Sequence, residues 1–198
     1  MYYGPQIMQE AGFNTSKSLT IVTAIPMAAV NFLGTIFNVT YIDNLGRRKM
    51  LLWTIPPMIC MLLGLAVAFG LINFSSYVPV GQWMAIICAC LFVGFFAIGL
   101  GAIPWIVNSE IYPLHLRSIA NSVSTTANWI ANFIVSMSFL TMMSTPTGQV
   151  YAWIIISFFA TFTWFWVFIR LPETKGKKLE DIILLFKGPK NSAVNAEE

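Results

Sequence analysis

Charged side chains are scarce in this sequence, and long stretches contain none. Of 198 residues, 11 are Lys or Arg and 8 are Asp or Glu, a charged fraction of 10%, whereas about a quarter is usual in a soluble domain. The runs 18–42, 50–109 and 118–169 have no Asp, Glu, Lys or Arg at all. Such a chain has too few charged residues to cover a water-exposed surface. Its net charge of +3 is too small to indicate a polyanion partner. The composition excludes a soluble enzyme and a nucleic-acid-binding protein.

Cysteine and histidine are also rare, which limits the chemistry the chain can carry. Its 3 cysteines lie inside the uncharged runs and its 1 histidine is His115, so no metal-ligand spacing is visible. No nucleophile with its base and no phosphate-binding loop can be recognised. No ionisable residue stands deep in an uncharged run, where a proton relay would require one. We therefore expect no enzyme activity, no catalytic residue, no metal site and no cofactor.

The uncharged runs are long enough to cross a membrane several times. A helix needs about 20 apolar residues to span the hydrocarbon core, so run 18–42 fits one span and the other two runs fit two each. Helices satisfy their own backbone in lipid, so the sequence predicts an all-α, polytopic membrane protein. The bundle, residues 1–171, holds five full spans and the end of a sixth helix at 1–12. The five are expected at 19–42, 50–72, 83–108, 118–143 and 149–170.

The basic residues predict which way the chain faces. In this topology, Lys and Arg gather in the turns 43–49 and 109–117 and in the tail after residue 169, whereas the other side has only Lys17. The positive-inside rule therefore predicts a cytoplasmic C-terminus. Within the tail, 172–198, apolar residues recur at helical spacing and predict a short amphipathic helix at 177–187.

Polar side chains set two of the spans apart from the uniformly apolar spans 50–72 and 149–170, which we expect to face lipid. In span 19–42, Asn31, Thr35 and Asn38 share one helical face. Span 118–143 carries a longer stripe, made of Asn121, Thr125, Asn128, Asn132 and Ser136. A buried amide is costly unless it is paired. The stripes therefore indicate either hydrogen bonds between helices or a water-lined pathway, and the length of the second stripe favours a pathway.

Span 83–108 is interrupted by backbone breakers. Gly94, Gly99, Gly101 and Pro104 lie in its second half, and Trp105 follows the proline directly. Gly- or Pro-interrupted membrane helices mark the binding sites of many transporters. Trp105 could offer a stacking surface to a ring-shaped substrate, or it could be an ordinary packing residue.

Five motifs, spaced through the chain, resemble those of one transporter family. They are Tyr2–Pro5, Asp43–Arg48, Ile103–Arg117, Asn128–Asn132 and Pro172–Gly176. In this order they resemble the end of helix seven, the turn between helices eight and nine, helix ten, helix eleven and the segment after helix twelve of the sugar porters. The chain thus resembles the C-terminal half of a major facilitator superfamily sugar porter, about two-fifths of a usual carrier.

The resemblance implies roles for individual residues. Asn31 matches an Asn of helix eight that bonds a substrate hydroxyl, and Trp105 matches a residue of helix ten that packs on the substrate ring. Asn128 and Asn132 match helix eleven and complete the expected substrate site. The expected inner gate is a cytoplasmic charge cluster consisting of Arg47, Arg48, Glu110 and Arg117.

Within the family, the segments Val107–Pro113 and Gly176–Glu180 look most like the proton/myo-inositol symporters. The short stretch 73–82 departs from that branch, which often has a long insertion there. Glucose carriers place a sugar-binding Glu where this chain has Ala97. The resemblance implies alternating-access transport of a small neutral sugar or polyol, myo-inositol with protons being favoured, in the plasma membrane. The alternatives are a facilitative hexose carrier and a non-transporting sugar sensor or half-carrier. Since the helix-seven glutamines and the whole N-terminal half of such a carrier are missing, we expect a fragment that is inactive alone.

Overall fold

The computed structural model describes residues 16–74, 77–173 and 175–176, and in these ranges it contains helices and no strand. The helices are α2 (Ser16–Leu45), α3 (Arg47–Phe74), α4 (Val78–Ile98), α5 (Ile103–Ile111), α6 (Leu114–Met143) and α7 (Pro146–Arg170). The all-α prediction is confirmed. The expected helix end at 1–12 and the tail helix at 177–187 lie outside the described residues.

Each predicted span falls on a helix, with one difference in the third span and one in the fourth. The third, 83–108, is divided into α4 and α5 by a break at 99–102. The fourth lies within α6, which has 30 residues. Among the described residues, however, four segments are both long and apolar enough to cross a membrane, and α6 is not one of them. Because amides and hydroxyls recur along α6, it is more polar than the other long helices.

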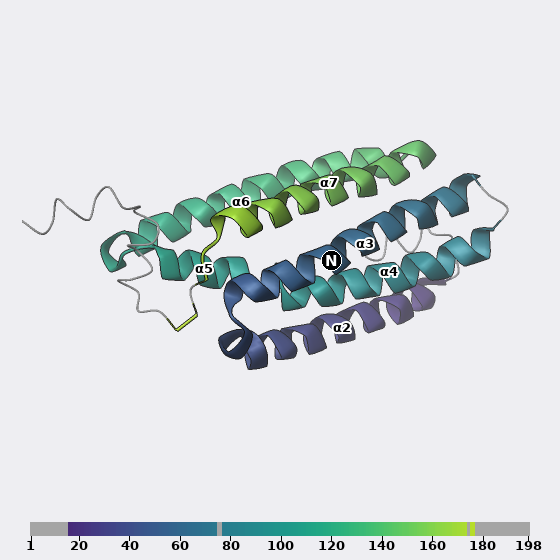
Figure 1. The fold of residues 1–198 in the computed structure, drawn as a ribbon. Helices are drawn as coiled ribbons and strands as arrows, with labels where there is room; N and C mark the ends of the chain where they lie inside the picture. The colour runs from purple at the N-terminus through teal and green to yellow at the C-terminus, as the bar shows by residue number, and fades with distance from the viewer. Residues whose placement is uncertain (1–15, 75–76, 174, 177–198) are drawn as a thin grey trace, which may run out of the picture.

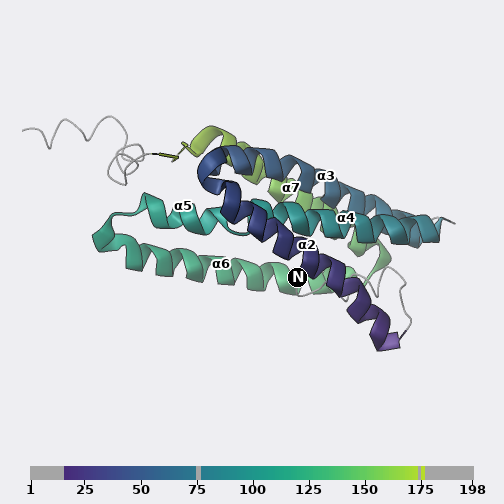
Figure 2. The same ribbon diagram turned by 90° about the horizontal axis from the view of Figure 1, so that it is seen from below.

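The long helices lie in a row with short turns between sequence neighbours. Contacts join α6 to α7, α7 to α3, α3 to α4 and α4 to α2, so α3 is the middle of the row (Figure 1). Viewed from below, α2 crosses α4 obliquely (Figure 2). The short helix α5 contacts α6 and α3. The α2–α3 turn, the α5–α6 turn and the end of α7 share one end of the bundle. Among the described residues, this end carries every Lys and Arg except Lys17.

Two apolar clusters hold the row together, and α3 contributes to both. Near the α3–α4 turn, Leu65 and Phe69 of α3 pack with Phe139 of α6 and Trp153 of α7. The Trp153 ring lies 6.0 Å from Phe69 and 5.3 Å from Phe139, centroid to centroid. Near the basic end, α3 packs through Met50, Leu51 and Ile55 against α5 and α7. Span 50–72, expected to face lipid, is thus buried along much of its length, although Trp53, Leu63 and Val67 are exposed. Uniform hydrophobicity does not distinguish a buried helix face from a lipid-facing one.

Candidate substrate face and charged cluster

The predicted substrate residues lie on α2, α5 and α6, away from the middle of the row. Trp105 is in the first turn of α5, immediately after the break, and 45% of its surface is exposed. Asn31 on α2 is half-buried, whereas Asn128 and Asn132 on α6 are exposed. Among the described residues, no hydrogen bond or ring contact joins Asn31 or Trp105 to the two asparagines of α6. The structure thus places these side chains on three helices without bringing them into contact, and their role stays a prediction.

Part of the polar stripe on α6 bonds a neighbouring helix, and part of it is exposed. At its start, Asn121 accepts a hydrogen bond from Asn108 of α5 at 2.9 Å, and Ser124 donates to Asn108 at 3.1 Å. Farther along, Asn132 donates only to the Asn128 carbonyl of its own helix, at 2.9 Å. An open surface depression of about 410 Å³ is lined by Thr125, Thr126, Trp129, Ile130 and Phe133, all of them on α6. One end of the stripe therefore joins two helices, and the middle is open.

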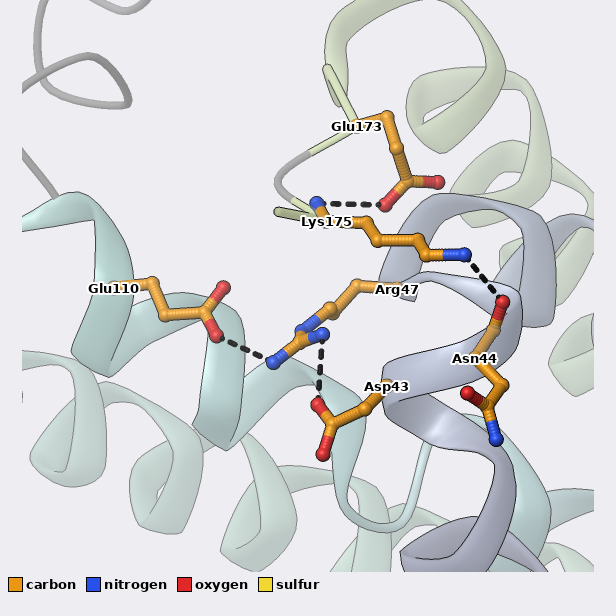
Figure 3. Close-up of polar contacts among 6 residues, drawn as sticks. All are labelled: Asp43, Asn44, Arg47, Glu110, Glu173 and Lys175. Carbon is orange, nitrogen blue, oxygen red and sulfur yellow. Dashed lines mark hydrogen bonds and ion pairs between the residues drawn. The ribbon is translucent and has the colours of Figure 1, made fainter. Parts of the chain in front are cut away.

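At the basic end, Arg47 connects the α2–α3 turn to α5. Its guanidinium contacts the Asp43 carboxylate at 3.1 Å and the Glu110 carboxylate at 3.0 Å (Figure 3). The side chains of Arg47 and Glu110 are only 16% and 19% exposed, whereas that of Asp43 is 80% exposed. Because water screens an exposed pair, the half-buried contact to Glu110 is the stronger of the two.

Glu173 closes the cluster from the end of α7. One of its carboxylate oxygens accepts from the Lys49 backbone N–H at 3.4 Å, in the first turn of α3, where helical N–H groups lack backbone partners. The other accepts from the Lys175 N–H at 3.3 Å, and the Lys175 ammonium donates to the Asn44 carbonyl (Figure 3). Glu173 thus caps α3 and ties the segment after α7 to the α2–α3 turn.

Gly46 makes room for this cap. Its φ is +89°, and a Cβ added there would lie 2.8 Å from each of the Glu173 carboxylate oxygens. Only glycine adopts such a φ without strain, and only glycine leaves space for the carboxylate. The turn between α2 and α3 is therefore built around the side chain of Glu173.

The other two expected gate residues bind backbone carbonyls. Arg48 donates to the Phe168 carbonyl of α7 at 2.8 Å, and Arg117 donates to the Tyr112 carbonyl at 3.4 Å. Of the four predicted residues, the structure thus pairs Arg47 with Glu110 and places Arg48 and Arg117 against neighbouring helix ends.

Sequence reasoning missed the carboxylates of Asp43 and Glu173 and the ammonium of Lys175 as members of the cluster. All three lie within the family motifs at 43–48 and 172–176. The signal that could have found them is the topology itself, because the α2–α3 turn and the end of α7 are on the same predicted side of the membrane.

A polytopic helix bundle with a broken helix, an aromatic residue at the break and a charged cluster at one end is the architecture of a membrane transporter. The family model "Sugar (and other) transporter" matches residues 1–186, and the chain belongs to that family. It is a multi-pass membrane protein with a major facilitator fold, as expected.

Individual relatives agree with this assignment. The chain is 38% identical to a protein named probable polyol transporter 6 of Arabidopsis thaliana, over 94% of this chain and 38% of the relative. It is 31% identical to myo-inositol transporter 1 of Cryptococcus neoformans, over 94% of this chain and 34% of the relative. Among solved structures, the proton:xylose symporter XylE bound to 6-bromo-6-deoxy-D-glucose superposes with a TM-score of 0.79 at 22% identity, over 93% of this chain and 38% of that one. The chain thus spans between a third and two-fifths of the length of these proteins.

Proposed function

We propose that this chain is the C-terminal half of a carrier that moves a small neutral polyol across the membrane by alternating access, with myo-inositol as substrate and protons as the coupled ion. The observation that carries the proposal is the family match over residues 1–186, with polyol and inositol transporters among the relatives. The rest of the carrier, a preceding N-terminal half, is its partner, and the lipid bilayer surrounds it. We place the C-terminus in the cytoplasm and the carrier in the plasma membrane.

The surroundings of Ala97 support a polyol over glucose. Ala97 is 5% exposed and faces α2, where a Cβ on Gly34 would already lie 2.9 Å from the Ala97 Cβ. A glutamate at position 97 would have no space against α2 in this arrangement. The carboxylate with which glucose carriers hold their sugar has no counterpart there. Recognition of hydroxyl groups is therefore left to amides such as Asn31, while Trp105 packs on the substrate ring.

In the proposed mechanism, the charged cluster is the inner gate. The Arg47–Glu110 pair joins the turn before α3 to the end of α5, and it closes the cytoplasmic end while the substrate face is open outward. In the part of the chain that the structure describes, the buried Nε atoms of Arg47, Arg48 and Arg117 have no hydrogen-bond partner. We propose that acidic residues of the N-terminal half pair with these guanidiniums when the gate is closed, and that the pairing breaks as the carrier turns inward.

The test is uptake by cells that express the complete coding sequence. We expect labelled myo-inositol to accumulate and a protonophore to abolish accumulation. Trp105→Leu should lower uptake about ten-fold at equal surface expression, because a stacking contact of about 0.5–1.5 kcal/mol and part of the buried area are lost. Trp53→Leu is the matched control, since Trp53 is 81% exposed on α3 and should leave uptake unchanged.

Each alternative has its own outcome. Uptake of hexoses without a response to the protonophore would replace the proposal with a facilitative hexose carrier. Surface expression without uptake of any sugar or polyol would replace it with a non-transporting sensor or half-carrier. If Trp105→Leu and Trp53→Leu behave alike, Trp105 has no substrate role.

A further inference from the structure

The break between α4 and α5 leaves a backbone carbonyl without its usual helical partner. In a continuous helix, the Ile98 carbonyl would accept from the N–H four residues later. Across the break, the Gly101 N–H instead reaches back five residues to Phe96, at 2.7 Å, and the Ile103 N–H bonds Gly99, at 3.2 Å. A carbonyl freed in this way at membrane depth needs another donor wherever protein or lipid surrounds it.

The donor is the side chain of Asn38 on α2. Its Nδ2 donates to the Ile98 carbonyl, and the residue is only 1% exposed. One turn earlier on α2, Gly34 lets the two backbones approach, since a Cβ there would lie 2.9 Å from the Gly94 carbonyl oxygen of α4. The close packing brings Asn38 within reach of the break. Asn38 shares a helical face with Asn31, but only Asn38 is fully buried against α4, whereas Asn31 is half-buried and Thr35 is exposed.

The same site is held from α3. The Thr54 hydroxyl donates to the Met50 carbonyl of its own helix at 2.8 Å, and its oxygen lies 2.1 Å from where a Cβ on Gly99 would be. Thr54 is 7% exposed and fills the space beside Gly99. Two helices thus hold the α4 side of the break. Asn38 of α2 donates to the Ile98 carbonyl, and Thr54 of α3 packs against Gly99. Trp105 follows a few residues beyond.

We propose that Asn38 is a positioning residue that sets the geometry of the α4–α5 break, and through it the placement of Trp105. Its amide replaces the backbone donor that the break removes, so the break has one defined conformation. The structural part of this inference stands by itself. The consequence for substrate rests on the proposed function, because it takes Trp105 to contact the substrate.

The chain offers a second bond of the same chemistry at a different place. Pro56 has no N–H, so the Leu52 carbonyl four residues earlier in α3 also lacks its helical donor. The indole N–H of Trp164 on α7 donates to it at 3.3 Å. This bond joins α3 to α7 within the row, at a proline inside a helix that continues on both sides. Its removal should cost stability without altering the α4–α5 break.

The test compares Asn38→Leu with Trp164→Phe in the full-length carrier, with wild type and Thr40→Val beside them. Asn38→Leu keeps the approximate size of the side chain and removes its donor. Trp164→Phe removes the other donor. Thr40 is exposed on α2 and bonds only the Ile36 carbonyl of its own helix, at 2.8 Å, so Thr40→Val controls for the loss of a polar side chain on α2. The readouts are peptide-resolved hydrogen exchange of the amides at 99–103 and the KM and maximal rate of uptake per surface carrier.

We expect Asn38→Leu to speed exchange at 99–103 and to raise KM, each about five-fold, the size of effect that one lost hydrogen bond produces. Exchange in the middle of α4 should not change. Trp164→Phe should lower the melting temperature yet leave KM and exchange at 99–103 as in wild type. If Asn38→Leu does not reach the surface, Asn38→Ala provides the same comparison.

Unchanged exchange at 99–103 in both Asn38 variants would overturn the proposal, as would equal changes in Trp164→Phe. Faster exchange with an unchanged KM would overturn its link to Trp105. If the wild-type carrier takes up no sugar or polyol, the proposed function fails, and the exchange measurement still decides whether Asn38 holds the break.

Discussion

At the scale of single residues, Gly46 shows how a turn and a charged cluster depend on each other. Its φ of +89° sets the direction in which α3 leaves α2, and its missing side chain leaves space for the Glu173 carboxylate. Glu173 in turn caps the first turn of α3. A side chain at position 46 would disturb both the backbone and the cap.

Gly46→Ala should therefore destabilise the protein more than an alanine at another glycine of positive φ. The φ alone costs about 1–2 kcal/mol, and displacement of Glu173 adds to it. Gly176 is the matched control, because its φ is +71° and nothing lies within 4 Å of an added Cβ. The measurement is the melting temperature of each variant in detergent.

The same two glycine variants can also be compared in a protein that carries Glu173→Ala. With Glu173→Ala in place, no carboxylate remains beside position 46, and Gly46→Ala should then cost about as much as Gly176→Ala. Equal melting temperatures for the two glycine variants in the wild-type background would show that the Glu173 contact contributes nothing.

At the scale of elements, the Arg47–Glu110 pair links the α2–α3 turn to α5. A charge-assisted hydrogen bond is worth about 1.5–3 kcal/mol when shielded from water, whereas an exposed pair is worth about 0–1 kcal/mol. A double-mutant cycle of Arg47→Gln with Glu110→Gln, read by unfolding in SDS, should thus give the larger coupling energy. The cycle of Arg47→Gln with Asp43→Asn should give less than half of it. A larger coupling to Asp43 than to Glu110 would contradict the proposed gate contact.

Much of the element structure could be predicted from the sequence, because charge marks helix ends in a membrane protein. The uncharged runs located the long helices that the structure describes, and Gly99, Gly101 and Pro104 indicated the break. Pairing across the bundle could not be predicted in the same way. Asn38 has the spacing of the polar face that contains Asn31, yet it is buried against α4 because Gly34 lets the helices approach.

For the candidate site, too, the residues could be predicted but their arrangement could not. Residue type alone identified Asn31, Trp105, Asn128 and Asn132 as candidates, because polar groups in apolar helices are costly unless they have a partner. Their mutual arrangement could not be predicted, because they lie on α2, α5 and α6 and no sequence spacing relates them. Likewise, Glu173 is more than 120 residues from Lys49 in the chain, and only the common end of the bundle brings them together.

At the scale of the whole molecule, the exposed faces of α2 and α6 are the features that the proposed carrier must explain. Phe32 and Leu33 on α2 are 65% and 63% exposed, and Trp129 and Phe133 on α6 are 58% and 67% exposed. In the proposed carrier, these helices face the substrate pathway and the N-terminal half. The chain covers 38% of the xylose symporter that it superposes on, so in the proposed carrier the other half supplies the opposite wall.

The most direct test of this account is myo-inositol uptake into liposomes that contain the purified chain alone or the chain co-purified with the preceding half of its carrier. We expect uptake driven by a proton gradient only when both halves are present, and none from the chain alone. Uptake by the chain alone, or no uptake of any polyol or sugar by the two halves together, would contradict the account.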